Sequence, residues 1–325
     1  MTPSRIGMGC MGFAGVYGPV DEAEAVRAVQ RALEVGVNFF DTADVYGNGA
    51  SEGLLGRALA GRRSEAFIAT KFGNIDHYGH LPVAQAFDGR WETNGRPEYA
   101  KRACEASLER LRIDAIDLYY LHRVDPQTPI EDTVGAMSDL VRAGKVRYIG
   151  LSEAGPETIR RAHTVHPLAA LQTEYSLWSR DAEQWALGLC AELSIRFIAY
   201  SPLGRGFLTG EITDARGLAE QDWRRHQPRF DAGNLERNLR MLDALRKVAA
   251  SRGCSLAQVA LAWTMRHAHV SPVPGAKRAA HVEQNAAAGA IALEPAEFSL
   301  LDAAFEPGAA AGNRYPDVQM RRLNL

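Results

Sequence analysis

The sequence predicts an α/β fold, a (β/α)₈ TIM barrel that forms one domain over residues 1–325. Eight short apolar segments alternate with helical segments, and no linker or low-complexity stretch divides the chain. Eight such repeats favour a closed barrel over an open sheet. A length of 325 residues lies within the range that these barrels reach as a single unit.

The expected strands are continuous apolar runs, which is typical of parallel strands covered on both faces. They lie at 5–10, 38–41, 67–71, 115–122, 146–151, 170–173, 196–200 and 270–273. Helix starts are marked by capping-box patterns at 21–24, 128–131 and 255–258, and Gly36 and Gly144 suit helix ends.

Composition and charge argue against several classes of protein. A net charge of −2 gives no general attraction to nucleic acid or to an anionic membrane. No apolar run approaches the ~20 residues that span a bilayer. The N-terminus shows no signal-peptide pattern, and the four scattered cysteines form no CxxC pair, so we expect neither disulfides nor a metal site. The expected location is a reducing cytoplasm.

Four polar residues follow three successive expected strands. Asp41 ends the second strand and Tyr46 follows it, Lys71 ends the third strand, and His122 ends the fourth. Taken alone, each has an ordinary structural interpretation, such as a cap, a surface lysine or a structural histidine. The carboxyl ends of barrel strands converge on one mouth, where active sites lie, so the joint placement favours a site.

These residue types suit the reduction of a carbonyl group. Tyr46 can protonate the carbonyl oxygen, although the ordinary pKa of tyrosine is ~10. A lysine ammonium ~4 Å away, at an effective dielectric of ~20, stabilises the phenolate by about 4 kcal/mol and would lower that pKa by up to ~3 units. Asp41 would keep Lys71 charged, and a neutral His122 would donate an N–H to the carbonyl oxygen. The hydride must come from a cofactor.

Later strands and two long loops add to the same face. Ser152 follows the fifth strand, Gln172 lies on the sixth, and Tyr200 ends the seventh. Loops of this length are usually functional.

The loop 73–95 contains Trp91, a candidate for the substrate pocket or for packing. The loop 204–233 is a candidate cover for the cofactor, with a surface insertion as the alternative.

The motifs around these residues resemble the aldo-keto reductases over nearly the whole chain, with similarity to the pyridoxal-reductase-like and auxin-induced-protein-like branches. The matching segments are NFFDTADVYG at 38–47, TKFG at 70–73, DLYYLH at 117–122, KVRYIGLS at 145–152, YSPLGRG at 200–206 and PGAKR at 274–278. The resemblance implies NADPH-dependent reduction of an aldehyde or ketone to the alcohol. It makes Tyr46 the proton donor, tuned by Lys71 and Asp41, and it makes His122 the residue that positions the substrate.

The resemblance also implies a cofactor site. Tyr200 would stack on the nicotinamide, Ser152 and Gln172 would bind its carboxamide, and backbone amides after the seventh strand would hold the pyrophosphate. Lys277 would meet the 2′-phosphate, which favours NADPH over NADH. The full implied set is Gly12, Ser152, Gln172, Tyr200, Ser201, Pro202, Leu203, Gly204, Gly206, Gly275, Lys277, His281, Gln284 and Asn285.

Two features depart from the family pattern. Many relatives have Ser-Asn after the fifth strand, but this chain has Ser152-Glu153, and an ionised glutamate cannot donate to the carboxamide oxygen. The chain also begins almost at its first strand, so most of the N-terminal hairpin of relatives is expected to be missing. We expect this to affect stability more than chemistry.

Three other interpretations compete with this one. The segment 7–12 matches GxGxxG, but about six residues precede it and the next helix is expected near Asp21, which argues against a Rossmann dehydrogenase. A Schiff-base aldolase using Lys71 would not need Tyr200 or Lys277. An NADPH-binding, redox-sensing regulatory subunit similar to the potassium-channel β subunits stays open. The expected partner is a small-molecule carbonyl compound, and the oligomeric state is not predicted.

Overall fold

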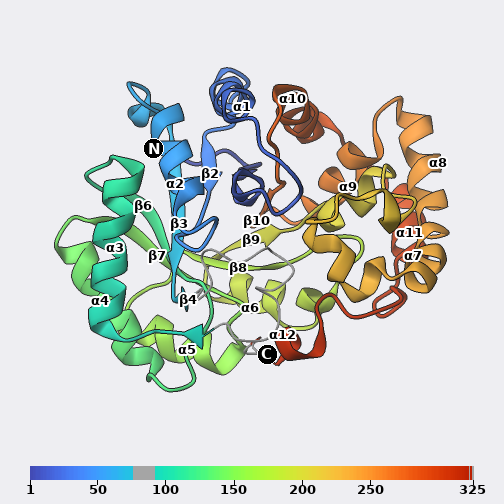
Figure 1. Cartoon of the computed structure of the whole chain (residues 1–325). Helices are drawn as coiled ribbons and strands as arrows, with labels where there is room; N and C mark the ends of the chain where they lie inside the picture. The colour runs from blue at the N-terminus through green and yellow to red at the C-terminus, as the bar shows by residue number, and fades with distance from the viewer. Residues whose placement is uncertain (76–91, 322, 324–325) are drawn as a thin grey trace.

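The computed structural model describes residues 1–75, 92–321 and 323, and Figure 1 shows a ring of helices around a central sheet. Within these residues, one eight-stranded parallel sheet has the order β1-β2-β3-β6-β7-β8-β9-β10. In that order the strands are Met8–Gly9, Phe39–Asp41, Phe67–Phe72, Ile116–Leu121, Val146–Ser152, Ala170–Glu174, Arg196–Tyr200 and Val270–Val273. The predicted strand at 5–10 was too long, because only Met8 and Gly9 form the strand that pairs with β2.

The barrel closes where the segment containing β1 meets β10. The N–H of Gly7 donates to the carbonyl of Pro272 at 2.9 Å, and that of Gly9 to Pro274 at 3.0 Å. A Cβ on Gly9 would lie 2.9 Å from the carbonyl oxygen of Val273, so the approach requires glycine. These glycines therefore serve barrel closure rather than a Rossmann phosphate loop.

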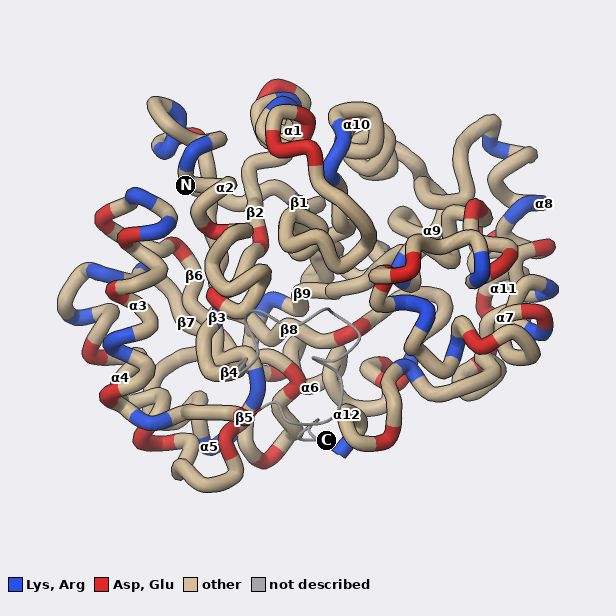
Figure 2. Tube along the Cα trace, in the orientation of Figure 1, with Lys and Arg blue, Asp and Glu red and all other residues tan. Residues whose placement is uncertain are grey.

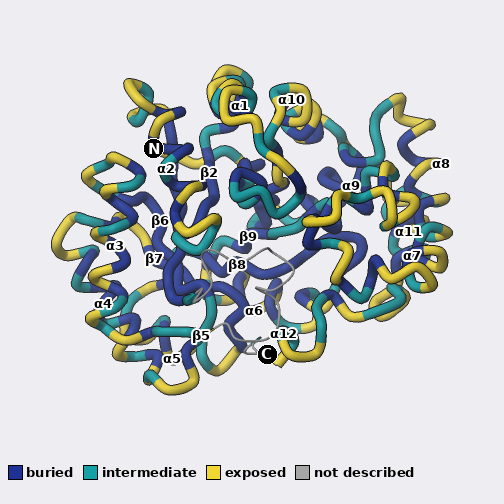
Figure 3. The backbone as a smooth tube through the Cα atoms, viewed as in Figure 1, coloured by how far each residue is buried: buried dark blue, intermediate teal, exposed yellow. Residues whose placement is uncertain are grey.

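Helices follow the strands and cover the outside of the barrel (Figure 1). They are α1 (Glu22–Glu34), α2 (Ala50–Ala58), α3 (Pro97–Leu111), α4 (Ile130–Arg142), α5 (Pro156–Val165), α6 (Ala186–Glu192), α7 (Ala232–Leu239), α8 (Leu242–Arg252), α9 (Leu256–Thr264), α10 (Ala279–Ala287), α11 (Pro295–Ala304) and α12 (Asp317–Met320). Most strand residues are buried while the outer helix faces are exposed (Figure 3). No helix in the described part of the chain is long and apolar enough to cross a membrane.

Two of the three predicted capping boxes behave as expected at their N-caps. Asp21 accepts from the N–H of Glu24 at 3.0 Å, and the pair Ser255 and Gln258 forms a complete box. The prediction at 128–131 is wrong, because the Thr128 hydroxyl donates to Asp125 at 2.8 Å and α4 begins after a proline without a side-chain cap.

The long loop after β3 is fixed at its base. Its described ends form an antiparallel hairpin of β4 (Asn74–Ile75) and β5 (Glu92–Thr93). The N–H of Gly95 donates to Asp125 at 2.9 Å, which ties the end of the loop to the segment after β6. Trp91, the candidate for the substrate pocket, lies outside the described residues.

The long loop after β9 is folded rather than irregular. It contains the short 3₁₀ helices η4 (Gly204–Thr209), η5 (Ala215–Gly217), η6 (Trp223–His226) and η7 (Pro228–Phe230). Its aromatic side chains Phe207, Trp223 and Phe230 are buried, and the N–H of Trp223 donates to the carbonyl of Val16 at 3.2 Å. The loop therefore reaches the segment that follows β1, as a cover over this side of the mouth would.

Candidate active site at the barrel mouth

A buried lysine connects three of the four predicted catalytic residues. Lys71 donates from Nζ to Oδ1 of Asp41 at 2.6 Å, to the carbonyl of Thr42 at 2.8 Å and to the hydroxyl of Tyr46 at 3.3 Å. The imidazole of His122 packs edge-on against the Tyr46 ring, with centroids 5.8 Å apart. The structure thus brings together all four residues at one end of the barrel.

The lysine is held in its charged form. Burial lowers the pKa of Lys71, but the Asp41 carboxylate and the Tyr46 phenol raise it, and the net direction is upward. Gln172 completes the arrangement, because its side-chain amide donates to Oδ2 of Asp41 at 2.7 Å. Both carboxylate oxygens therefore have donors, which fixes the orientation of the carboxylate beneath the lysine.

The expected net fall in the pKa of Tyr46 is wrong. Burial raises the pKa of the phenol by more than the Lys71 ammonium lowers it, and the Asp41 carboxylate raises it further. The lysine acts in the expected direction, but the cost of desolvating a phenolate is larger. The Tyr46 hydroxyl is therefore protonated at neutral pH and can serve as a donor.

The imidazole of His122 is neutral, as the sequence argument expected. Its pKa lies well below the ordinary value, first because of burial and then because of the Arg123 and Lys71 charges. The Nδ1 atom is buried and has no hydrogen-bond partner among the described residues. A proton on Nδ1 would have no acceptor, so we infer that the neutral ring carries its proton on Nε2, where it can donate.

The residues predicted for the nicotinamide lie on β7, β8 and β9, with Ser152 and Tyr200 at the ends of their strands and Gln172 in the middle of β8. Ser152 and Gln172 are buried, and the Ser152 hydroxyl accepts from Nη1 of Arg123 at 3.1 Å. The hydroxyl of Tyr200 lies 2.9 Å from that of Tyr315, which belongs to the C-terminal segment. Ser152 pairs with Gln172 between β7 and β8, and β8 pairs in turn with β9, so the three predicted residues lie on neighbouring strands.

The turn predicted for the pyrophosphate has an unusual backbone. Ser201, Gly204 and Gly206 all have left-handed φ values, of 49°, 56° and 95°. Left-handed residues within a turn orient successive amides into an anion-binding concavity. The N–H groups of Gly204 and Gly206 already donate within the turn. A phosphate would therefore use other amides of 201–206, such as that of Leu203.

Lys277 lies just before α10. Figure 2 shows a short basic stretch leading into α10 beside an acidic stretch leading into α1, where Arg278 lies 3.8 Å from Glu24. Its Nζ donates to the carbonyls of residues 17–19 at 2.9–3.5 Å. Burial and the charges of Arg278 and Arg224 lower the pKa of Lys277. Lys277 therefore fixes the loop after β1, and a 2′-phosphate would share its ammonium with these carbonyls.

The remaining predicted cofactor residues fall in two places. Gly12 follows β1, where a Cβ would meet nothing within 4 Å, and Gly275 forms the bridge that completes the barrel. His281 and Gln284 are exposed on α10, whereas Asn285 on the same helix is buried. The last residue therefore packs inward rather than facing solvent.

A buried ion pair links the end of β7 to the C-terminal segment. The sequence argument missed this pair. Glu153 is fully buried, and its carboxylate accepts from both terminal nitrogens of Arg314 at 3.0 Å each. Burial raises the pKa of Glu153, but Arg314 and Arg123 lower it further, so the residue is ionised. The carboxylate that was considered as a carboxamide acceptor is thus engaged by Arg314.

A second buried pair lies beside the first. Arg205 donates from Nη2 to Glu174 at 2.7 Å and from Nη1 to the carbonyl of Arg314. Its guanidinium lies 4.5 Å from the ring centroid of Tyr315. The two pairs join the ends of β7 and β8, the turn after β9 and the C-terminal segment, which runs back toward the barrel in Figure 1.

Asp44 gives the folded chain a pH dependence. Its Oδ1 is buried with no partner in the described part of the chain, and burial together with Glu52 raises its pKa from 3.8 to about 8. The folded chain therefore holds the proton of Asp44 more tightly than the unfolded chain does. The stability that comes from this protonated carboxyl is complete below the unfolded pKa and is lost as the pH rises through about 8. We therefore expect Asp44→Asn to gain stability relative to the parent chain between pH 5 and pH 8.5. Urea denaturation at both pH values measures this, and a constant difference would contradict it.

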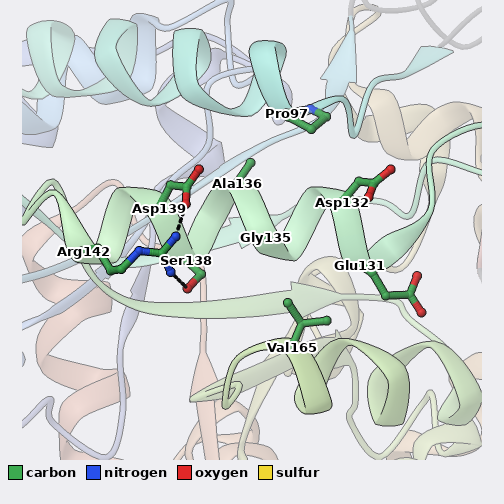
Figure 4. Close-up of a pocket in the computed structure, with 9 residues that line it drawn as sticks. All are labelled: Pro97, Glu131, Asp132, Gly135, Ala136, Ser138, Asp139, Arg142 and Val165. Atoms are coloured by element: carbon green, nitrogen blue, oxygen red, sulfur yellow. Dashed lines mark hydrogen bonds and ion pairs between the residues drawn. The ribbon is translucent and has the colours of Figure 1, made fainter.

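A hollow of about 410 Å³ lies on the outer surface, between α4 and the neighbouring ends of α3 and α5 (Figure 4). Two of its carboxylates are already paired, Glu131 with Arg161 at 2.7 Å and Asp139 with Lys101 at 2.7 Å. It contains none of the residues of the barrel mouth.

The sequence model of the Aldo/keto reductase family matches residues 5–306. The chain belongs to the aldo/keto reductase family. This aldo/keto reductase is 42% identical over 315 residues to a probable aldo-keto reductase 1 from Glycine max, an alignment that covers 96% of this chain and 88% of the relative. Membership makes the chain an NADP-dependent oxidoreductase.

Solved structures resemble this aldo/keto reductase over almost its full length. A glycerol dehydrogenase from Gluconobacter oxydans is 29% identical with a TM-score of 0.83, and the match covers 100% of this chain and 94% of that one. An aldo-keto reductase from Klebsiella pneumoniae in complex with NADPH is 28% identical with a TM-score of 0.72, covering 97% and 95%. The barrel predicted from the sequence is confirmed.

Proposed function

We propose that this aldo/keto reductase reduces an aldehyde or ketone to the alcohol with NADPH, and that Tyr46 is the general acid. The observation that carries the proposal is the position of Lys71, whose buried ammonium contacts both the Asp41 carboxylate and the Tyr46 hydroxyl. The same ammonium that holds the phenol also stabilises the phenolate left after proton transfer.

Each of the four central residues has a defined part in the proposed reaction. NADPH supplies the hydride when it is bound. The Tyr46 hydroxyl donates its proton to the carbonyl oxygen, and Lys71 stabilises the resulting phenolate. His122 donates from Nε2 to the same oxygen and orients it. Asp41 keeps the lysine charged without entering the reaction.

The donors around the mouth fit NADPH. Tyr200 offers a ring for the nicotinamide, and Ser152 and Gln172 offer hydrogen-bonding groups for its carboxamide. The left-handed turn at 201–206 offers backbone amides for the pyrophosphate. Lys277, ahead of α10, offers a cation for the 2′-phosphate. The similar aldo-keto reductase from Klebsiella pneumoniae was solved in complex with NADPH.

Lys277→Ala should weaken NADPH binding by about 10- to 100-fold, which is the usual contribution of a hydrogen bond to a charged group. NADH, which lacks the 2′-phosphate, should lose much less. Fluorescence titration with the two nucleotides measures the difference. Lys247→Ala, on the exposed face of α8, is the matched control. Equal losses for both nucleotides would mean that Lys277 acts only through the loop at 17–19.

Turnover with a defined aldehyde tests the proposed function. The purified chain should oxidise many equivalents of NADPH in the presence of 4-nitrobenzaldehyde, followed at the absorbance band of the reduced nicotinamide. A single slow turnover that stops at one equivalent per chain would instead support a redox-sensing subunit. Trapping of substrate on Lys71 by borohydride would support a Schiff-base enzyme and would contradict the proposal.

A further inference from the structure

Arg123 is a cation at the barrel mouth that has no carboxylate partner within hydrogen-bond or ion-pair distance among the described residues. It directly follows His122 at the end of β6, and it is half-buried. Its Nη1 donates to the carbonyl of His122 at 2.6 Å and to the hydroxyl of Ser152 at 3.1 Å. Within residues 1–75, 92–321 and 323, its Nε and Nη2 have no hydrogen-bond partner and the guanidinium has no ion pair.

The neighbouring cations differ from Arg123 because carboxylates neutralise them. The pairs are Lys71 with Asp41 at 2.6 Å, Arg205 with Glu174 at 2.7 Å and Arg314 with Glu153 at 3.0 Å. The charges within these three pairs cancel. Among the described residues, Arg123 is therefore left without a carboxylate of its own beside the reacting groups: the Glu153 carboxylate favours its charge from a distance but forms its ion pair with Arg314.

The charge of Arg123 acts on the residues that contact the carbonyl group. It contributes to the lowered pKa of His122 and opposes the rise in the pKa of Tyr46. An uncompensated charge in a partly buried site is costly, and the cost falls when a ligand supplies the opposite charge. The Nε and Nη2 edge of a guanidinium presents two parallel donors, which match the two oxygens of a carboxylate or phosphate.

We propose that Arg123 binds a carboxylate or phosphate of the substrate, so that the enzyme prefers anionic aldehydes or ketones to neutral ones of the same shape. The inference rests on the proposed function, since it names the substrate class of that same site. The two hydrogen bonds through Nη1 hold the guanidinium beside His122, with its other edge left for the anionic group.

A pair of matched aldehydes separates charge from shape. 4-Carboxybenzaldehyde and 4-nitrobenzaldehyde both carry a planar group with two oxygens, but only the first is anionic. We expect Arg123→Met to lower kcat/KM for the carboxylate by about 10- to 100-fold more than for the nitro compound. Arg123→Lys should restore part of the preference, because it keeps the charge without the paired donors. The 3-substituted isomers extend the test to a second position of the anionic group.

A third aldehyde distinguishes the two sources of negative charge. If the natural anionic group is a phosphate, Arg123→Met should lose more activity with 4-formylphenyl phosphate than with 4-carboxybenzaldehyde. If it is a carboxylate, the order of these losses reverses. Either order supports the proposal as long as both losses exceed the loss with the nitro compound.

Two outcomes overturn different claims. If the parent chain turns over neither benzaldehyde, the proposed function fails. If the parent reduces 4-nitrobenzaldehyde but Arg123→Met and Arg123→Lys leave the carboxylate-to-nitro ratio of kcat/KM unchanged, only the Arg123 inference fails. A matching rise in the Kd for NADPH in that case would assign Arg123 to the cofactor through Ser152. Near-ultraviolet circular dichroism verifies that both variants are folded.

Discussion

Tyr46→Phe should lower kcat for 4-nitrobenzaldehyde by about 10²- to 10⁴-fold, the range that a positioned general acid contributes. The substitution removes the hydroxyl that Lys71 contacts at 3.3 Å, but it keeps the ring that packs against His122. Affinity for NADPH should stay nearly constant, because the cofactor is assigned to other residues. Steady-state kinetics and fluorescence titration of the nucleotide measure the two effects separately.

The matched control for this variant is Tyr148→Phe. Tyr148 lies on β7, and its side chain is exposed. Removing that hydroxyl should leave both kcat and NADPH affinity unchanged. Retained turnover in Tyr46→Phe would remove Tyr46 from the role of acid and would leave the Lys71 contact as a structural feature.

Glu153→Gln should destabilise the chain by about 3–5 kcal/mol, the usual cost of breaking a buried ion pair by removing one partner. The variant leaves the buried Arg314 guanidinium with only the Glu174 carboxylate, which lies 3.9 Å away and is already paired with Arg205. The double variant Glu153→Gln with Arg314→Gln should recover part of the loss, because no uncompensated charge remains. Chemical denaturation monitored by circular dichroism gives the free energies of unfolding.

An exposed pair of the same geometry provides the control. Glu192 also accepts from both terminal nitrogens of an arginine, Arg160, at 2.7 and 2.8 Å, but on the surface. Water screens that pair, so Glu192→Gln should cost little. Equal losses in Glu153→Gln and Glu192→Gln would show that burial is not the reason for the effect.

The fold and the four central residues could be predicted because their signals are local. A parallel barrel brings the ends of all its strands to one mouth, so residues that end successive strands must meet there. Asp41 and Lys71 end adjacent strands in the sheet order, and Tyr46 is only five residues beyond the first of them. Their contact follows from strand order alone, without knowledge of the loops.

The charges around this centre could not be predicted in the same way. Glu153 and Arg314 are 161 residues apart, and their pairing depends on the path of the C-terminal segment. The net pKa shift of Tyr46 required knowledge of its burial, which outweighs the Lys71 charge. Arg123 is adjacent to a predicted catalytic residue, but its lack of a carboxylate partner among the described residues depends on how the neighbouring acids pair with Lys71, Arg205 and Arg314.

The short contact between the first and last strands has a consequence for synthesis. The first 122 residues contain Asp41, Tyr46, Lys71 and His122. The barrel around them cannot close, however, until residues 270–275, which include its last strand, have left the ribosome. Domains generally fold as units during translation. A nascent chain that already carries every reacting group would therefore remain inert until its last strand docks beside Gly9.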